Sequence, residues 1–125
     1  MTLEQRLVLF IRDLNIVMST PDSILIFSQK GEDENFVQFN QRIDQPLYCE
    51  VTTRNWGGTL APLEPVALAQ LSFLGYALPE PNERDNASKY FNGAPRELAE
   101  EVEKIFREVF ELAEDYDVMS SGVFQ

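Results

Sequence analysis

The hydrophobic pattern of this chain changes from the period of a helix to the period of a strand near residue 22. Between Leu3 and Met18, apolar side chains recur every three or four residues and form a stripe along a helix. Thr2 and Gln5 fit a capping box at the start of that helix. From Ser23 onward the period is two, which is typical of strands. The change predicts a helix followed by a sheet.

Three segments rich in β-branched and aromatic residues follow the helix and are separated by polar turns. They are Ser23–Gln29, Phe36–Gln41 and Leu47–Arg54, and their order predicts a three-stranded antiparallel meander. In the third segment, alternation places Leu47, Cys49, Val51 and Thr53 on one face, and Tyr48, Glu50, Thr52 and Arg54 on the other. We expect the first of these faces to lie against the helices.

The second half of the chain is mainly helical in pattern. We expect a helix over Pro62–Gly75, a short edge strand at Lys89–Phe91, and a long helix over Pro95–Ala113. The tail, Val118–Gln125, has neither caps nor periodicity and is expected to be loose. The expected fold class is α+β: a single domain over residues 1–125, with an antiparallel meander packed against helices in the order α-β-β-β-α-(β)-α.

Composition and charge exclude several classes of protein. A length of 125 residues fits one domain, and an apolar content of 44% argues against disorder. Ten basic and 21 acidic residues give a net charge of −11, so nucleic acids and anionic membranes, both polyanions, are poor partners. No apolar run approaches the ~18 residues of a membrane span. A single cysteine and the lack of a signal-peptide pattern favour a cytoplasmic location.

The residues needed for most site chemistry are missing from the sequence. There is no histidine, and one cysteine alone cannot build a zinc site. No glycine-rich phosphate loop is present, and the acidic turn Glu32-Asp33-Glu34 lacks the ligand spacing of an EF-hand. Cys49 lies among aliphatic residues, so we interpret it as a small buried hydrophobe. We expect no catalytic residue, no metal, no cofactor and no enzymatic activity; a hydrolase that uses carboxylates alone is the least favoured class.

The predicted sheet carries more apolar material than one core face requires. Ile24, Leu25, Ile26 and Phe27 are all apolar, so both faces of the first strand are hydrophobic. Either the second helix or the loop around Trp56 covers the second face, or that face meets another polypeptide or a second copy of the chain.

Four residues are candidates for binding a partner on that second face. They are Trp56, Tyr48, Phe36 and Arg54. Tryptophan and tyrosine bury large areas while keeping a polar atom, which makes them frequent interface anchors. For Trp56 we give equal weight to the alternative that its indole closes the open end of the sheet.

The succession of segments resembles a known family. The residues that carry the resemblance are Phe36–Phe39, the strand Leu47–Arg54 leading into Asn55-Trp56, the helix Pro62–Tyr76, Asn86–Phe91 and the helix Pro95–Leu112. Together they are similar to the YbjN-like and type III secretion chaperone-like domains, also called TY-Chap. The resemblance implies a secretion-chaperone-like fold and a small acidic protein that binds other proteins, often as a homodimer. It transfers no individual functional residue.

The function expected from the sequence is therefore that of a non-enzymatic, chaperone-like protein-binding domain of a bacterial cytoplasm. The alternative is an acidic inhibitor or immunity-type protein that masks a basic surface of its partner. Salt distinguishes the two, because an electrostatic contact weakens at high ionic strength and an apolar contact does not.

Overall fold

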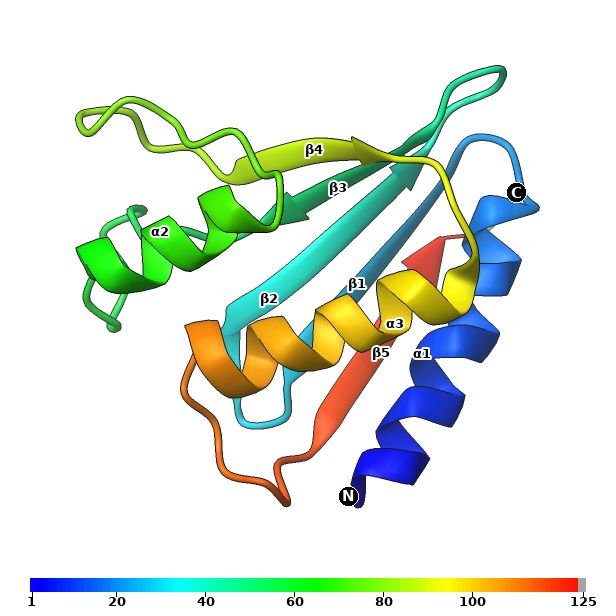
Figure 1. Cartoon of the computed structure of the whole chain (residues 1–125), viewed down its shortest axis with the longest axis horizontal. Helices are drawn as coiled ribbons and strands as arrows, with labels where there is room; N and C mark the ends of the chain where they lie inside the picture. The colour runs from blue at the N-terminus through cyan, green and yellow to red at the C-terminus, as the bar shows by residue number, and fades with distance from the viewer. Residues whose placement is uncertain (124–125) are drawn as a thin grey trace.

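The strands form an antiparallel sheet in the order β4-β3-β2-β1-β5 in the computed structural model, which describes residues 1–123 (Figure 1). In chain order the elements are α1 (Leu3–Met18), β1 (Ser23–Gln29), β2 (Glu32–Gln41), β3 (Leu47–Val51), α2 (Pro65–Phe73), β4 (Ala87–Phe91), α3 (Pro95–Lys104) with its π-helical continuation η1 (Ile105–Val109), and β5 (Val118–Val123). The fold is α+β, as the sequence predicts.

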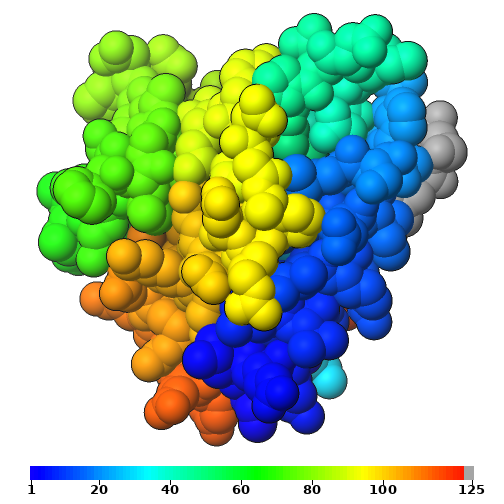
Figure 2. Space-filling model, turned by 45° about the vertical axis from the view of Figure 1, so that its right-hand side comes forward, coloured from blue at the N-terminus to red at the C-terminus, as the bar shows by residue number. Residues whose placement is uncertain are grey.

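The helices α1, α2 and α3 all lie on the same side of the sheet (Figure 1). Figure 2 shows this side, with α3 between the N-terminal helix and α2. By sequence alone, the second helix is one of the elements that could cover the opposite face of the sheet. That interpretation is wrong, because Leu71 of α2 is fully buried in the same core as α1 and α3.

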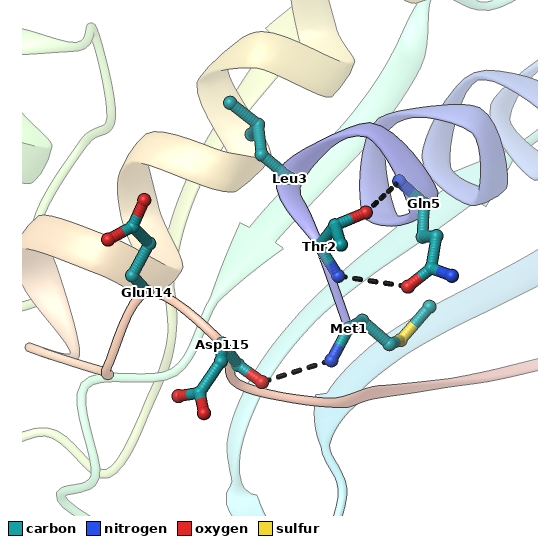
Figure 3. Close-up of a pocket in the computed structure, with 6 residues that line it drawn as sticks. All are labelled: Met1, Thr2, Leu3, Gln5, Glu114 and Asp115. Carbon is teal, nitrogen blue, oxygen red and sulfur yellow. Dashed lines mark hydrogen bonds between the residues drawn. The ribbon is translucent and has the colours of Figure 1, made fainter.

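The start of α1 confirms the predicted capping box (Figure 3). The Gln5 N–H donates to Thr2 Oγ1 over 3.1 Å, and the Thr2 N–H donates to Gln5 Oε1 over 2.9 Å. The apolar stripe, however, does not mark the most buried side of the helix. Residues Arg6, Phe10, Asp13, Leu14 and Val17 are buried, whereas Leu3 is 49% exposed. Two buried polar residues, Arg6 and Asp13, displace the inner face from the position that hydrophobicity alone indicates.

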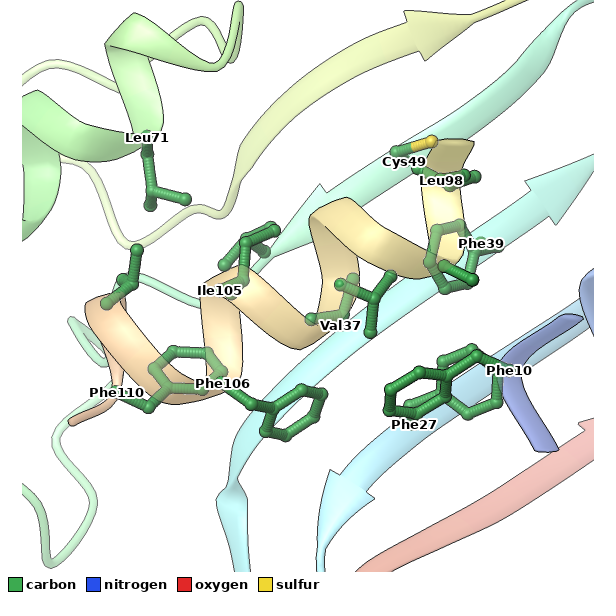
Figure 4. Packing of buried hydrophobic residues seen from close by; sticks show 14 of the residues in the cluster. Phe10, Phe27, Val37, Phe39, Cys49, Leu71, Leu98, Ile105, Phe106 and Phe110 are labelled. Carbon is green, nitrogen blue, oxygen red and sulfur yellow. The ribbon is translucent and has the colours of Figure 1, made fainter. Parts of the chain in front are cut away.

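The core is built from the odd-numbered residues of β1 to β3, from Ala87 of β4 and Val118 of β5, and from the inner faces of the helices (Figure 4). Phe27 of β1 has Phe10 of α1 and Phe39 of β2 as neighbours, with ring centroids 4.7 and 5.7 Å away. In β3 the expected alternation is confirmed, since Leu47, Cys49 and Val51 are buried. The side chains that alternate with the core residues therefore point to the opposite face; in β5 these are the odd-numbered ones, because Met119 pairs with Ser28.

Residues Val118–Val123, expected to be loose, instead form β5. This strand pairs antiparallel with β1 from Ile24↔Val123 to Gln29↔Val118. Its sequence is short, mostly small and polar, and gives no strand signal by itself; tertiary pairing with β1 decides its structure. The last two residues of the predicted tail, 124 and 125, lie outside the described part of the chain.

Two other elements end earlier than the sequence indicates. β3 stops at Val51, and Arg54 adopts a left-handed backbone conformation with φ of 57°. The last helix becomes a π-helix at Ile105, and Glu111 at φ 57° follows its end. The edge strand expected at Lys89–Phe91 is present and begins two residues earlier, at Ala87.

Candidate functional site

The second face of the sheet is not covered by any helix of residues 1–123, and we call it the open face. Its described apolar side chains are Ile24 and Ile26 from β1, Phe36 from β2, Tyr48 from β3, Tyr90 from β4 and Met119 from β5. Tyr90 is 62% exposed and Met119 54% exposed. Polar residues on the same strands separate these side chains, so the face is amphipathic rather than continuously apolar.

Two tyrosines form the most defined feature of the open face. Tyr48 and Tyr90 are cross-strand neighbours whose ring centroids lie 5.2 Å apart at an angle of 50°. With Asn40, Arg42 and Glu50 they line most of a hollow of about 300 Å³. The Glu50 carboxylate accepts a hydrogen bond from Asn86 Nδ2 over 2.8 Å. The hollow thus offers aromatic faces with hydrogen-bonding groups at their rim, which is suited to binding amphipathic side chains.

Of the four predicted partner-binding residues, the structure places Phe36 and Tyr48 on the open face. The two residues do not belong to the same row of cross-strand pairs. Phe36 pairs with Ser28 of β1, whereas Tyr48 pairs with Asn40 of β2. Sequence reasoning missed Tyr90, although it follows from alternation within the predicted strand Lys89–Phe91. The sequence gives no indication that Met119 lies on this face, because its segment is expected to be loose.

Arg54 lies on the helix-covered side, not on the open face. Its Nε donates to Asn35 Oδ1 over 2.8 Å, and its guanidinium carbon lies 5.5 Å from the ring centroid of Phe110. Burial lowers the pKa of Arg54. The prediction placed Arg54 on the open face by extending the strand alternation past Val51, where the ladder ends.

Trp56 is 47% exposed and lies on a loop that is fixed at both ends. Asn55 Nδ2 donates to the Glu83 carbonyl over 2.9 Å. The Thr59 N–H donates to the Glu34 carboxylate over 3.1 Å, and the Thr59 hydroxyl bonds the same carboxylate. The hydrogen bond from the Thr59 hydroxyl is the main cause that lowers the pKa of Glu34. Trp56 does not line the hollow formed by Tyr48 and Tyr90.

A second exposed apolar surface lies on α2. The chain carries no charge from Pro65 to Pro79. Phe73 is 91% exposed and Val66 is 66% exposed. Together with residues of α3 and η1, they border a groove of about 400 Å³. A helix that is apolar on all sides is normally buried on all sides, so this surface is a second candidate contact.

Two partly buried ionisable groups, Lys89 and Glu101, are paired with each other. Lys89 Nζ donates to Glu101 Oε1 over 2.7 Å and to the Leu74 carbonyl over 2.8 Å, and it lies 4.7 Å from the Tyr76 ring centroid. Burial raises the pKa of the Cys49 thiol to about 12. In the described chain, no group of three or more acidic or cysteine side chains is arranged to hold a metal ion. The Lys89–Glu101 pair links β4 to α3.

A hollow of about 670 Å³ lies between the start of α1 and the turn at Glu114 and Asp115 (Figure 3). Of the groups that line it, Thr2 and Gln5 cap the helix, and the Met1 amine donates to the Asp115 carbonyl over 3.0 Å.

An antiparallel sheet with helices on one face and an amphipathic open face on the other defines a small α+β domain of the chaperone-like type. A family model described as "TY-Chap3: T3SS (YopN, CesT) and YbjN peptide-binding chaperone 3" matches residues 2–121, and the chain belongs to this family. The resemblance noted in the sequence is thereby confirmed. Neither a curated protein nor a solved structure gives a significant match. Among residues 1–123, no helix is both long and apolar enough to cross a membrane.

Proposed function

We propose that this chain is a non-enzymatic, chaperone-like domain of a bacterial cytoplasm that binds a segment of another polypeptide on the open face of its sheet. The observation that carries the proposal is the exposure of Tyr90, Met119 and Ile24 on a rigid sheet surface. The family's description as peptide-binding chaperones supports it.

The open face is suited to an extended or unfolded segment. Its aromatic and aliphatic side chains alternate with amides, hydroxyls and a carboxylate, so a bound segment can bury apolar side chains while its polar groups stay hydrogen-bonded. Because the apolar side chains are spread over β1 to β5, they match a chain that runs across the strands better than a compact small molecule.

We further propose that two copies associate as a homodimer through the exposed surface of α2. Phe73 and Val66 are more exposed than the side chains of the open face, and no charge on α2 opposes the contact. Light scattering over a wide concentration range tests this. The Phe73→Ser variant is expected to shift the mass toward the monomer value of 14.3 kDa, and a wild-type protein that is monomeric throughout would contradict the dimer.

The test of the proposed function is capture of proteins from a native bacterial lysate, followed by mass spectrometry. Tyr48→Ala and Tyr90→Ala are each expected to reduce capture while changing the free energy of unfolding by less than ~1 kcal/mol, the range of surface positions. Val8→Ala is the matched control, since Val8 is 61% exposed on α1, away from the open face.

Salt separates this function from that of an acidic protein that masks a basic surface. Capture through the open face should persist at high ionic strength, because apolar contacts are not screened. Capture that disappears at high salt and is unchanged in Tyr48→Ala and Tyr90→Ala would refute the proposal.

A further inference from the structure

The strand β5 is held to the sheet mainly by main-chain pairing with β1. Among its described side chains only Val118 is buried, whereas Met119, Ser120, Ser121 and Gly122 are exposed. On the other side of β1, β2 contributes Val37 and Phe39, both fully buried. Pairing with few buried side chains opens more readily than pairing that closes a core. β5 is therefore easier to release from β1 than β2 is.

The segment that leads into β5 is firmly anchored. Arg6 donates hydrogen bonds to the carbonyls of Glu114 over 2.9 Å and Tyr116 over 3.0 Å. The Lys30 N–H donates to the Asp117 carbonyl over 2.9 Å. Tyr116 is buried and its ring stacks on Phe106, with centroids 5.3 Å apart. Release of the strand can therefore start after Val118, which stays buried, and leave the core closed.

Without β5, the edge of β1 would be a binding surface of defined chemistry. The strand carries no charged residue and is apolar on both faces, with Leu25 and Phe27 toward the core and Ile24 and Ile26 on the open face. The Lys30 N–H donates to the Asp117 carbonyl, so the main-chain N–H and C=O groups of Lys30 face β5. In an antiparallel ladder every second residue faces the same neighbour, so the main-chain groups of Ile24, Ile26 and Ser28 also face β5.

We propose that the edge of β1 binds an extended peptide strand of the partner in place of β5, which occupies this edge when no partner is bound. The inference rests on the proposed function and adds to the open face a second contact with the same partner, the addition of a strand to a sheet edge. The seated β5 shows what the edge accepts: an uncharged segment, with the residue at the position of Ser121 beside Ile26 on the open face.

One position of the added strand is further specified. The Ser120 hydroxyl donates to Asp13 Oδ2 over 2.6 Å on the helix-covered side of the sheet. Asp13 is only 8% exposed, and its other oxygen accepts from Arg12 Nε over 3.0 Å. A partner strand would place a small side chain with a hydrogen-bond donor at this position, because a bulky apolar residue would bury the carboxylate without a partner.

A reversible disulfide tests the proposal in the full chain. Ile26 and Ser121 are paired across the strands, a geometry with Cα atoms about 5.5 Å apart, which a disulfide spans. In the double variant Ile26→Cys/Ser121→Cys, oxidation locks β5 onto β1 and reduction frees it. Cys49 does not compete, because it is buried and its thiol stays protonated. The probe is a fluorescein-labelled peptide with the sequence of residues 117–123, DVMSSGV, followed by anisotropy.

The reduced double variant is expected to bind the peptide at least about tenfold more tightly than the oxidised one, because apparent affinity scales with the open fraction. Ser121→Pro removes a main-chain donor that faces β1 and is expected to bind at least about tenfold more tightly than the control Ser121→Ala. Equal binding by the oxidised and reduced forms, or by Ser121→Pro and Ser121→Ala, would overturn strand replacement. If Tyr48→Ala still reduces capture from lysate in that case, the proposed function stands and only this binding mode fails.

Discussion

Replacing Arg6 by methionine is expected to destabilise the fold strongly. Arg6 is fully buried, and its Nε and Nη2 donate to the two carboxylate oxygens of Glu103 on α3 over 2.9 and 2.7 Å. Its guanidinium carbon lies 4.0 Å from the ring centroid of Tyr116. Burial opposes the charge, but the hydrogen bond and charge of Glu103 raise the pKa of Arg6 above its usual value. The Arg6 guanidinium is therefore charged at every accessible pH.

The size of the effect follows from what the substitution leaves behind. In Arg6→Met the Glu103 carboxylate stays 9% exposed and keeps only the Tyr116 hydroxyl, 2.8 Å away. Breaking a buried ion pair by removing one partner costs about 3–5 kcal/mol. For a chain of this length each kcal/mol moves the melting temperature by roughly 3–6 °C. We therefore expect Tm to fall by about 10–30 °C.

Urea unfolding followed by circular dichroism measures the effect in a double-mutant cycle. Arg6→Met/Glu103→Met should cost clearly less than the sum of the two single changes, because neither charge is left unpaired. Arg12→Met is the matched control on the same helix. Arg12 pairs with Asp13 but its side chain is 63% exposed, so its loss should cost less than ~1 kcal/mol. An Arg6→Met protein within ~1 kcal/mol of wild type, or additive effects in the cycle, would refute the reasoning.

Three further outcomes are expected. Burial raises the pKa of Cys49 to about 12, so between about pH 9 and 12 the cysteine ionises in the unfolded chain and not in the folded one, and the fold loses stability. In unfolding titrations of the Cys49→Ala variant, the free energy of unfolding should fall with pH less steeply, by about 1.4 kcal/mol per pH unit. On α2, Leu71→Ala should cost about 2–5 kcal/mol, whereas Phe73→Ala on the exposed side should stay within about 0.5 kcal/mol of wild type, and equal costs in urea unfolding would contradict the burial described. The lowered pKa of Glu34 keeps its carboxylate ionised, and the loop contact formed, at pH values below the usual pKa of about 4.3. As the pH falls through the lowered value, the emission of Trp56, the single tryptophan, should shift, and in Glu34→Gln it should not shift.

The sequence predicts those parts of the fold in which local pattern and tertiary packing agree. The capping box of α1, the alternation of β1 to β3 and the start of α3 at Pro95 are examples, whereas α2 begins at Pro65, three residues later than expected. The pattern fails where a partner distant in sequence determines whether a residue is buried or a segment forms a strand. Arg6 is buried because Glu103 pairs with it, and residues 118–123 form a strand because the edge of β1 is available.

The candidate site was predicted in part, for a related reason. Alternation placed Tyr48 and Phe36 on the face away from the core, and the structure agrees. It failed for Arg54, because a left-handed residue ends the alternation and sequence alone does not locate the end of a hydrogen-bonded ladder. No sequence pattern showed that Tyr90 would lie beside Tyr48, since that contact depends on the register between β3 and β4.

The contact between α1 and α3 also determines the order in which the chain can fold. Arg6 and Glu103 are 97 positions apart in sequence, whereas β1, β2 and β3 are joined by short turns. Closing a long loop costs more chain entropy than closing a hairpin, so the meander is expected to form first and α1 to dock late. Substitutions of Arg6 should then speed unfolding and leave the folding rate nearly unchanged. During synthesis, Phe10 of α1 can already pack on Phe27 of β1, whereas the guanidinium of Arg6 has no carboxylate partner until Glu103 has left the ribosome.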